Sequence, residues 1–409
     1  DSYYPNINGV TLVIEAMRSS LCELDHEVYV FAPKPLNKKD QKIHDKLYVK
    51  RVPAINDMLF HDQSTSVFFP TTQYLRVKRL ELDVIIIFTP AQIGLLGSYC
   101  ALKLDIPLVS YYATDLVEYI ERYPFAILGV LALMRTTPLA LRMNTRDILR
   151  LIRISIPATR SDELWRKKIV KEMLKDFHAR CSQVIVPSYK SELQMQSWGV
   201  KTPIDIVPSG VNPPADLHTI SGQGFRHKYK IPTCIPVIMY LGRVAKEKNI
   251  DTLIEAMNEV LEAVPEAFLV IVGNFDYRKT LESKVARMNL SGSVIFTGKV
   301  SIDDRWQAFK AADIFVFPSV TDTQALVINE AALCGLPIVW CDKDVNGVLL
   351  DGQSGLLCEN TANSFAKTII KLLNDKALMV RLGQSARDRA TKMTEYSQAK
   401  KFSEVLSGL

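Results

Sequence analysis

The sequence lacks long hydrophobic runs and the best-known cofactor motifs. Its longest apolar stretch, FAILGVLALM at 125–134, is about half the length that a membrane-spanning helix needs. The seven cysteines are scattered without a CxxC pair, which argues against a zinc knuckle or a disulfide framework and favours reduced thiols in a cytoplasmic protein. Neither GxGxxG nor GxxxxGK(S/T) occurs, which argues against NAD-dependent enzymes and P-loop ATPases.

Short apolar runs rich in β-branched residues alternate with helical patterns along the chain. Each run is continuously apolar, as expected for a parallel strand that is covered on both faces. The alternation predicts an α/β fold with parallel sheets and right-handed crossovers. Strands are expected at 27–32, 83–88, 107–110, 183–187, 236–241, 268–272, 293–297, 313–317 and 337–341, and a helix at 249–264.

The elements divide into two halves of about 200 residues, each the size of one doubly wound domain. The Pro- and Gly-rich stretch VPSGVNPP at 207–214 is a plausible hinge, so an N-terminal domain is expected at 1–206 and a second domain at 207–388. The chain begins in a loop-like stretch, and a strand upstream of Asp1 is expected. Ligands of such domains bind at the carboxyl ends of the strands.

Two strand-to-helix loops carry residues suited to phosphate. In YLGRVAKEKN, Gly242 turns after a strand, and Arg243 and Lys248 follow before a helix begins, so the two cations can grip a diphosphate. The alternative is a pair of solvated surface charges. Asn8 and Gly9 form a turn before an apolar helix, where a phosphate can approach backbone N–H groups.

Two carboxylates flank the start of a helix in VFPSVTDTQALVINEAALCGLPIV. Asp322 and Glu330 lie eight positions apart around a turn of small residues. Carboxylates accept hydrogen bonds from hydroxyl groups, and a helix start presents free N–H groups. The alternative reading is a helix cap and a surface charge.

Together these stretches resemble the family 4 retaining glycosyltransferases of GT-B fold, over nearly the whole chain. The resemblance implies two Rossmann-like domains that face each other across a cleft, with a C-terminal helix, 389–409, that returns to the N-terminal domain. The stretches that carry it, in family order and spacing, are YPNINGV, VIVPSYKSELQMQSWGV, VPSGVN, YLGRVAKEKN, LVIVGN, VIFTGKV, AADIFVFPS and TDTQALVINEAALCGLPIV.

The resemblance implies roles for these residues. Glu330 would hold the ribose hydroxyls of a nucleotide sugar, and Asp322 would hold the sugar hydroxyls. Arg243 and Lys248 would neutralise the diphosphate leaving group, and these two cations and Asp322 would be the catalytic residues. The further donor-side positions are Asn8, Gly9, Gly242, Val300, Thr323, Gln324, Ala325 and Leu326.

Three positions depart from the family pattern. Asp322 replaces the commoner Glu, so its carboxylate reaches about one methylene less far. Ala325 replaces the usual Gly and is expected to narrow the donor pocket. Ala113 stands where relatives often carry His, so this imidazole contact is absent, while Tyr112 and Asp115 remain candidates near the acceptor.

The segment 137–181 is strongly basic. Between 135 and 181, twelve basic residues stand against five acidic ones, and the rest of the chain is nearly neutral. Thr137 and Pro138 are expected to start a helix whose apolar side holds Leu141, Ile148 and Ile152. The cations predicted to contact an anionic membrane surface are Arg142, Arg146, Arg150, Arg153, Arg166, Lys167 and Lys168. A solvated charged face is the alternative, while nucleic-acid binding is disfavoured because aromatic stacking residues are absent.

We therefore expect a metal-independent, retaining hexosyltransferase without a cofactor. Its donor would be of the UDP-glucose or GDP-mannose type, and its acceptor a membrane lipid, either diacylglycerol or a glycolipid. It would lie at the inner face of the plasma membrane as a peripheral protein. The alternatives are a family 4 enzyme of polysaccharide or cell-surface glycan synthesis and a non-catalytic nucleotide-sugar-binding or membrane adaptor protein.

Overall fold

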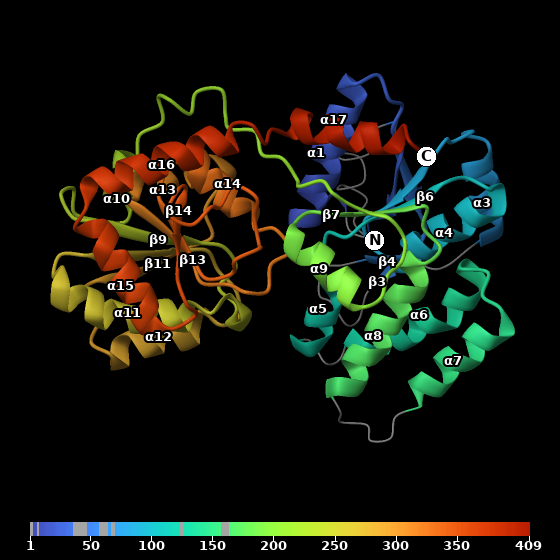
Figure 1. The fold of residues 1–409 in the computed structure, drawn as a ribbon, viewed down its shortest axis with the longest axis horizontal. Coiled ribbons are helices and arrows are strands. Elements are labelled where there is room, and N and C mark those ends of the chain that lie inside the picture. The colour runs from blue at the N-terminus through green and yellow to red at the C-terminus, as the bar shows by residue number, and fades with distance from the viewer. Residues whose placement is uncertain are drawn as a thin grey trace. The chain divides into compact units, whose positions relative to one another are not determined.

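The computed structural model describes residues 3–5, 8–35, 47–56, 64–66, 70–122, 126–156 and 163–409. The chain divides into two compact units (Figure 1). Unit 1 comprises Asp1–Ser209 and Gln398–Leu409, and unit 2 comprises Gly210–Ser397. Unit 1 continues as far as Ser209 because the hydroxyl of Tyr111 hydrogen-bonds both the carbonyl of Val207 and the hydroxyl of Ser209.

Unit 2 is built on a six-stranded parallel sheet with the order β11-β10-β9-β12-β13-β14. Every residue of β9, β12 and β13 is buried, which explains why these strands read as unbroken apolar runs. The strands are β9 (Val237–Leu241), β10 (Phe268–Val272), β11 (Val294–Gly298), β12 (Ile314–Phe317), β13 (Ile338–Trp340) and β14 (Gly355–Leu357).

Helices cover both faces of this sheet, because alternate strand residues point to opposite sides. Met239 packs into one hydrophobic cluster with Phe309 and Ile328, while its neighbour Ile238 packs into another with Leu253. The helices of unit 2 are α10 (Gln223–Lys228), α11 (Ile250–Ala263), α12 (Arg278–Arg287), α13 (Ile302–Ala311), α14 (Leu326–Leu333), α15 (Ala362–Leu373) and α16 (Lys376–Ala390).

Unit 1 contains a four-stranded parallel sheet with the order β5-β6-β7-β8, a separate parallel pair β1-β2, and an antiparallel pair β3-β4. Its strands are β1 (Val30–Pro33), β2 (Val49–Val52), β3 (Ala54–Asn56), β4 (Ser64–Ser66), β5 (Ile85–Ile87), β6 (Leu108–Tyr111), β7 (Gln183–Val186) and β8 (Ile204–Ile206).

The helices of unit 1 include the end of the chain. From α17, Ala399 and Phe402 are fully buried in one hydrophobic cluster with Met17 and Tyr111. The helices are α1 (Gly9–Glu23), α3 (Pro70–Lys78), α4 (Gln92–Leu104), α5 (Leu116–Arg122), α6 (Ala126–Ala140), α7 (Thr145–Ser155), α8 (Glu163–His178), α9 (Tyr189–Ser197) and α17 (Glu395–Leu406), the last of which begins in unit 2.

The predicted start of the basic helix was wrong. Thr137 and Pro138 lie inside α6, where the Thr137 hydroxyl donates to the carbonyl of Leu133. Arg142 then adopts a left-handed conformation with φ of 47°, and α7 begins only at Thr145, capped by the side chain of Asn144. The apolar run before Thr137 extends α6 past the expected boundary, because Pro removes only one hydrogen bond near a helix end.

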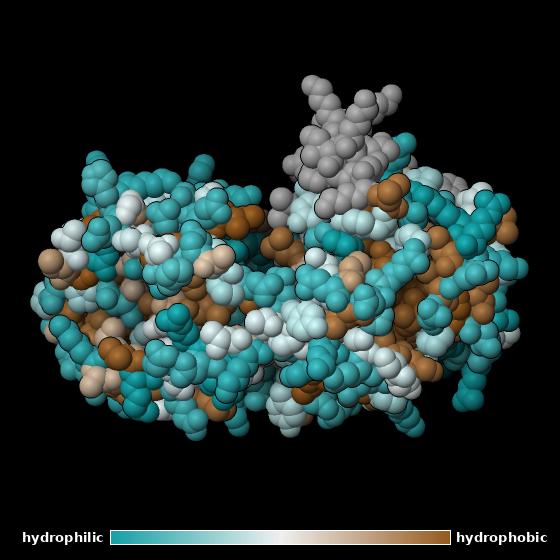
Figure 2. Space-filling model, turned by 90° about the horizontal axis from the view of Figure 1, so that it is seen from above, coloured by the Kyte–Doolittle hydropathy of each residue, from teal (hydrophilic) through white to brown (hydrophobic). Residues whose placement is uncertain are grey.

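Hydrophobic side chains reach the surface in patches. Figure 2 shows one face on which such patches interrupt a mostly hydrophilic surface. Among the helices of the described residues, none combines the length and the apolar character needed to cross a bilayer.

Candidate donor site

Three glycines close the carboxyl ends of β9, β10 and β11. Gly242, Gly273 and Gly298 follow or end these strands, and all three have positive φ. A Cβ on Gly273 would lie 1.8 Å from the carbonyl oxygen of Gly242, so no other residue fits there without moving the backbone. This close approach sets the path of the loop that leads from β9 to Lys248.

The structure joins Lys248 to Asp322. The Lys248 ammonium donates to both carboxylate oxygens of Asp322, over 2.7 and 2.8 Å, and the hydroxyl of Ser319 donates to one of them over 2.5 Å. Lys248 and Ser319 are both buried. Ser319, which sequence reasoning missed, directly follows Pro318 at the end of β12 and fixes the orientation of the Asp322 carboxylate.

Arg243 lies apart from this ion pair. Its guanidinium bonds Glu247 over 3.0 Å and lies over the ring of Phe275, with half of the side chain exposed. Each of the two cations predicted to hold the diphosphate thus has its own carboxylate partner within the protein.

Glu330 is buried on α14 and faces Arg305 of α13. Arg305 approaches one carboxylate oxygen of Glu330 at 2.7 Å, and the other oxygen is buried without a protein partner. Burial raises the pKa of Glu330 to about 7, against the opposing effect of Arg305. Sequence reasoning missed Arg305, because 25 positions separate it from Glu330 and no motif marks it.

The loop between Asp322 and α14 has a strained but well-supported backbone. Ala325 has φ of 59° and ψ of 77°, a conformation that explains why glycine suits this position. The buried side-chain amide of Asn346, also missed by sequence reasoning, donates to the carbonyls of Gln324 and Ala325 at 2.9 and 3.3 Å. Leu326 then begins α14, following Thr323, Gln324 and Ala325.

Two further predicted donor positions lie at turns. Val300 is half-buried against the core of unit 2, next to the exposed Lys299. In unit 1 the Asn8 side chain accepts from the backbone N–H of Thr11 at 2.9 Å and caps α1. Among the residues that the structure describes, no atom would lie within 4 Å of a Cβ on Gly9.

The predicted acceptor-side residues make local contacts in unit 1. The Tyr112 hydroxyl is 3.4 Å from the side-chain oxygen of Gln194, and burial raises the pKa of this phenol well above its usual value. Asp115 accepts from the backbone N–H groups of Val117 and Glu118 and from the side chain of Gln194. Ala113 is half-buried against another hydrophobic cluster.

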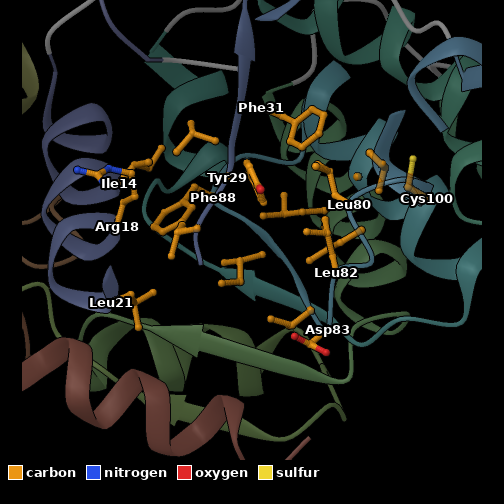
Figure 3. A pocket seen from close by; sticks show the side chains of 18 of the residues that line it. Ile14, Arg18, Leu21, Tyr29, Phe31, Leu80, Leu82, Asp83, Phe88 and Cys100 are labelled. Carbon is orange, nitrogen blue, oxygen red and sulfur yellow. The ribbon is translucent and has the colours of Figure 1, made fainter. Parts of the chain in front are cut away.

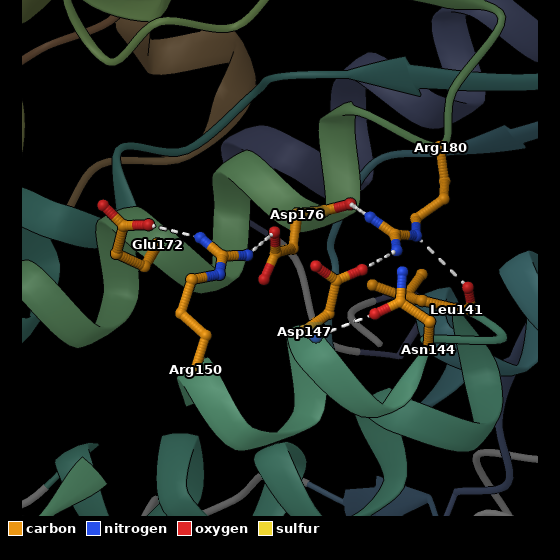
Figure 4. A network of polar contacts seen from close by, with 7 residues as sticks. All are labelled: Leu141, Asn144, Asp147, Arg150, Glu172, Asp176 and Arg180. Atoms are coloured by element: carbon orange, nitrogen blue, oxygen red, sulfur yellow. Dashed lines mark hydrogen bonds and ion pairs between the residues drawn. The ribbon is translucent and has the colours of Figure 1, made fainter. Parts of the chain in front are cut away.

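Several cations of the predicted membrane patch bind protein groups instead. Arg150 pairs with Glu172 at 2.8 Å and with Asp176 (Figure 4). Lys167 pairs with Glu121 at 2.7 Å. The side chain of Arg142 donates to the carbonyl of Leu102. These three cations therefore do not form the single exposed basic face that was predicted, because Arg150 turns toward the acids of α8 and the other two bind groups of α5 and α4.

The remaining surface of α7 is both apolar and basic. Leu149 and Ile152 of α7, and Ile156 just beyond its end, are 61%, 51% and 68% exposed, and Arg146 and Arg153 are also exposed. Of the predicted apolar side, Leu141 is buried and Ile148 half-buried, and Ile152 faces outward. Lys168 is also exposed, whereas Arg166 is only half-exposed. Residues 157–162 of the basic segment lie outside the described residues.

The comparisons with protein families cover most of the chain. A model of glycosyltransferase family 4 matches residues 7–214, just over half of the chain, and a model of glycosyl transferases group 1 matches residues 223–389. In the part of the chain that the structure describes, no group of three His, Cys, Asp or Glu side chains could hold a metal ion.

Individual relatives agree with these families. An alpha-monoglucosyldiacylglycerol synthase of Acholeplasma laidlawii is 25% identical over 391 residues, which cover 94% of this chain and 90% of the relative. A synthase of the same description from Streptococcus pneumoniae is 24% identical over 362 residues, 87% of this chain and 73% of the relative. The solved structure of Anabaena Alr3699/HepE with UDP and glucose has a TM-score of 0.68 at 18% identity, and covers 100% of this chain and 98% of that chain. This likeness of fold confirms the prediction of two Rossmann-like domains of GT-B type.

Proposed function

Since this chain belongs to glycosyltransferase family 4, we propose that it transfers a hexose from a nucleotide sugar to a membrane lipid, either diacylglycerol or a glycolipid. The observation that carries this proposal is the Lys248–Asp322 ion pair at the carboxyl ends of the unit 2 strands, with Glu330 buried nearby in sequence on the following helix. Carboxyl ends of parallel strands are where α/β domains bind their ligands.

Lys248 is suited to the diphosphate. An ammonium group has three donors, and two of the Lys248 donors go to Asp322, so one remains for a phosphate oxygen. Asp322 holds the cation in place and also presents carboxylate oxygens toward sugar hydroxyls. A cation at the leaving diphosphate stabilises the charge that develops as the glycosidic bond to the donor breaks.

Glu330 is suited to the ribose. Its second carboxylate oxygen is buried without a protein partner, and a ribose hydroxyl can donate a hydrogen bond to it. Arg243, half exposed on the neighbouring loop, can exchange Glu247 for a phosphate oxygen. Transfer would proceed without a metal and with retention at the anomeric carbon. The acceptor hydroxyl would attack from the face of the sugar that the diphosphate leaves, and an oxygen of the leaving diphosphate would take the proton of that hydroxyl.

The exposed side of α7 supports a lipid acceptor. Leu149, Ile152 and Ile156 form an apolar strip, and Arg146 and Arg153 lie beside it, as in helices that lie at a membrane interface. The two similar synthases are named for alpha-monoglucosyldiacylglycerol, a glycolipid. The protein would bind the inner face of the plasma membrane peripherally.

Donor turnover with defined vesicles tests the proposal. The protein is incubated with UDP-glucose, UDP-galactose or GDP-mannose, with phosphatidylglycerol vesicles that contain diacylglycerol, and label in the lipid and released nucleoside diphosphate are measured. We expect lipid label from one donor. Release of diphosphate without lipid label would overturn the lipid acceptor, and absence of release with every nucleotide sugar would overturn the transferase.

A triple substitution on α7 tests whether its exposed apolar side binds the membrane. Replacing Leu149, Ile152 and Ile156 by Ser is expected to lower vesicle binding and lipid labelling at least tenfold, with nucleotide binding unchanged. The matched control is Val380→Ser, since Val380 is 73% exposed on α16 of unit 2. Equal vesicle binding by the triple variant and the control would remove α7 from the proposal.

A further inference from the structure

Two cysteines lie next to each other at the carboxyl ends of β13 and β14. In this parallel pair of strands Trp340 lies opposite Leu357, and the backbone N–H of Cys358 donates to the carbonyl of Trp340 at 2.8 Å. This hydrogen bond continues the ladder by one residue, which places Cys341 opposite Cys358. The two cysteines are brought together only by the pairing of their strands, because no CxxC motif joins them in the sequence.

The two side chains point to the same face of the sheet. Cys341 follows the buried Val339 by two residues, and both belong to the hydrophobic cluster in which Cys358 is buried with Phe365. Neighbouring strands lie about 4.8 Å apart, and a disulfide joins Cα atoms that are about 4.4–6.8 Å apart. The backbone therefore already holds the two thiols at a separation that a disulfide can bridge.

The electrostatic surroundings of the thiols also identify this pair. Burial raises the pKa of Cys358 to about 12, and the nearby Cys341 acts in the same direction. Burial also raises the pKa of Cys100 and Cys181, but no second cysteine contributes there. Cys100, for example, lines a pocket of unit 1 (Figure 3). Of these three buried thiols, Cys358 alone has a neighbouring cysteine.

Cys341 is connected to the carboxylate of the Lys248–Asp322 ion pair. Its thiol donates to the carbonyl of Pro318 at 3.4 Å. Pro318 directly precedes Ser319, whose hydroxyl donates to the Asp322 carboxylate. A displacement of the Cys341 sulfur therefore acts on the segment that orients Asp322.

Cys358 is connected to the cation of the same ion pair. Two residues beyond it, the side-chain oxygen of Asn360 accepts from the amide of Asn249 at 2.6 Å. Asn249 directly follows Lys248, and its amide also lies 3.4 Å from the carbonyl of Pro318. The loops that follow both cysteine-bearing strands thus meet the two loops that carry the ion pair.

We propose that hydrogen peroxide converts Cys341 and Cys358 into a disulfide, and that this disulfide weakens donor binding at the Lys248–Asp322 ion pair. The half-buried Cys341 reacts first: its sulfur bonds one peroxide oxygen, the O–O bond breaks, and water leaves. The sulfur of Cys358 then attacks the oxidised sulfur, the S–S bond forms, the S–O bond breaks, and a second water carries away the proton of Cys358. The two thiols are thereby oxidised, and the peroxide is reduced to water.

The disulfide alters the support of Asp322. It removes the proton that Cys341 donates to Pro318 and draws the Cys341 sulfur toward β14. The segment from Pro318 to Ser319 then loses an anchor, so the Ser319 hydroxyl holds Asp322 less firmly. The weaker binding of a nucleotide sugar rests on the proposed function, whereas the disulfide and the loosening of this segment do not. Reduction by an added thiol reverses both changes.

Mass spectrometry after peroxide treatment tests the disulfide. The chain is treated with hydrogen peroxide, the remaining thiols are alkylated, and the monomer is digested with trypsin. Trypsin releases Cys358 in the peptide 344–367, and Cys341 together with Cys334 in the peptide 311–343. We expect the two peptides to be joined in the wild type and in Cys334→Ser, and to stay separate in Cys341→Ser. Separate peptides in the wild type, or joined peptides in Cys341→Ser, would overturn the proposal.

Hydrogen exchange and nucleotide binding test the connection to the donor site. Oxidation should accelerate exchange in peptides that cover 318–326 and weaken the binding of UDP or GDP about tenfold, and dithiothreitol should restore both. Cys341→Ser is the matched control, because its hydroxyl can still donate to Pro318 but cannot form a disulfide, so peroxide should change neither measurement.

The two measurements separate this proposal from the proposed function. Joined peptides with unchanged exchange at 318–326 would overturn the connection between the disulfide and the donor site. Accelerated exchange at 318–326 in an oxidised chain whose reduced form binds neither UDP nor GDP would support the connection and contradict the proposed function.

Discussion

The Lys248 ammonium and the Asp322 carboxylate form an ion pair in the candidate donor site. Both are largely withdrawn from solvent, with 11% and 21% of their side chains exposed. The pair is thus oriented before any donor arrives, and a preorganised charge costs no rearrangement during the reaction. Arg305 and Glu330 form a second oriented pair, in which one carboxylate oxygen stays available.

Removal of the Lys248 ammonium should abolish most of the turnover. We expect Lys248→Ala to lower kcat about 10²–10³-fold, because the charge on the leaving diphosphate loses its preorganised cation. Lys246→Ala is the control, since Lys246 is exposed two positions away on the same loop. Steady-state kinetics and a thermal melt of both variants check this, and turnover near that of the wild type for Lys248→Ala would contradict the site.

Glu330 should make stability depend on pH. Its pKa is raised from 4.5 to about 7 by burial, so the folded protein holds a proton that the unfolded chain has lost between these values. The free energy of unfolding should therefore fall as the pH rises from about 4.5 to 7. Glu330→Gln should remove this slope, while the exposed Glu262→Gln should keep it, as measured by urea unfolding at several pH values. If the free energy of unfolding depended equally on pH in all three proteins, the pH dependence would not come from Glu330.

At the scale of elements, α7 shows how one helix divides its cations between packing and surface. Arg150 and the Arg180 side chain of the segment after α8 tie α7 to α8, through Asp176 and Asp147 respectively (Figure 4). Arg146 and Arg153 stay on the exposed side with the apolar strip. Burial of the Asp176 carboxyl raises its pKa, although the nearby Arg150 guanidinium acts in the opposite direction. The charged form of this carboxyl is therefore stabilised by Arg150.

Loss of Arg150 should destabilise unit 1. Arg150→Ala leaves the buried Asp176 without its guanidinium partner, but 37% of the Arg150 side chain is exposed and solvent screens the pair. We therefore expect a loss of about 1–2 kcal/mol in the free energy of unfolding rather than the 3–5 kcal/mol of a fully buried pair. Arg146→Ala should change it by less than about 0.5 kcal/mol. Chemical denaturation checks this, and equal stabilities would mean that the pair contributes nothing.

At the scale of the whole molecule, the chain leaves unit 1 at Ser209 and returns to it at Gln398. The return is held by apolar contacts, since Phe402 packs near Tyr111 with 6.1 Å between the ring centroids. Unit 1 therefore needs residues from both ends of the chain for its core.

Truncation of Phe402 should loosen unit 1 alone. Phe402 is fully buried, so Phe402→Ala should cost about 3–5 kcal/mol. Tyr396→Ala, on the same helix with the side chain 45% exposed, is the matched control. Hydrogen exchange should accelerate in peptides of β6 and β7 and remain unchanged in β9 and β10. Equal acceleration in both units would show that they unfold together.

The sequence by itself determined the α/β class and the central strands of the two larger sheets, because fully covered parallel strands must be apolar without interruption. It did not predict the short edge strands β8 and β14, nor β2, β3 and β4. It also placed Asp322 and Glu330 at the start of one helix, since eight positions of local chain set that relation. Only the tertiary structure decided that Lys248 meets Asp322 across 74 positions, that Arg305 meets Glu330, and that Arg150 turns inward to Asp176. These pairs depend on which strands and helices become neighbours, and that follows from the packing of the whole core rather than from any local pattern.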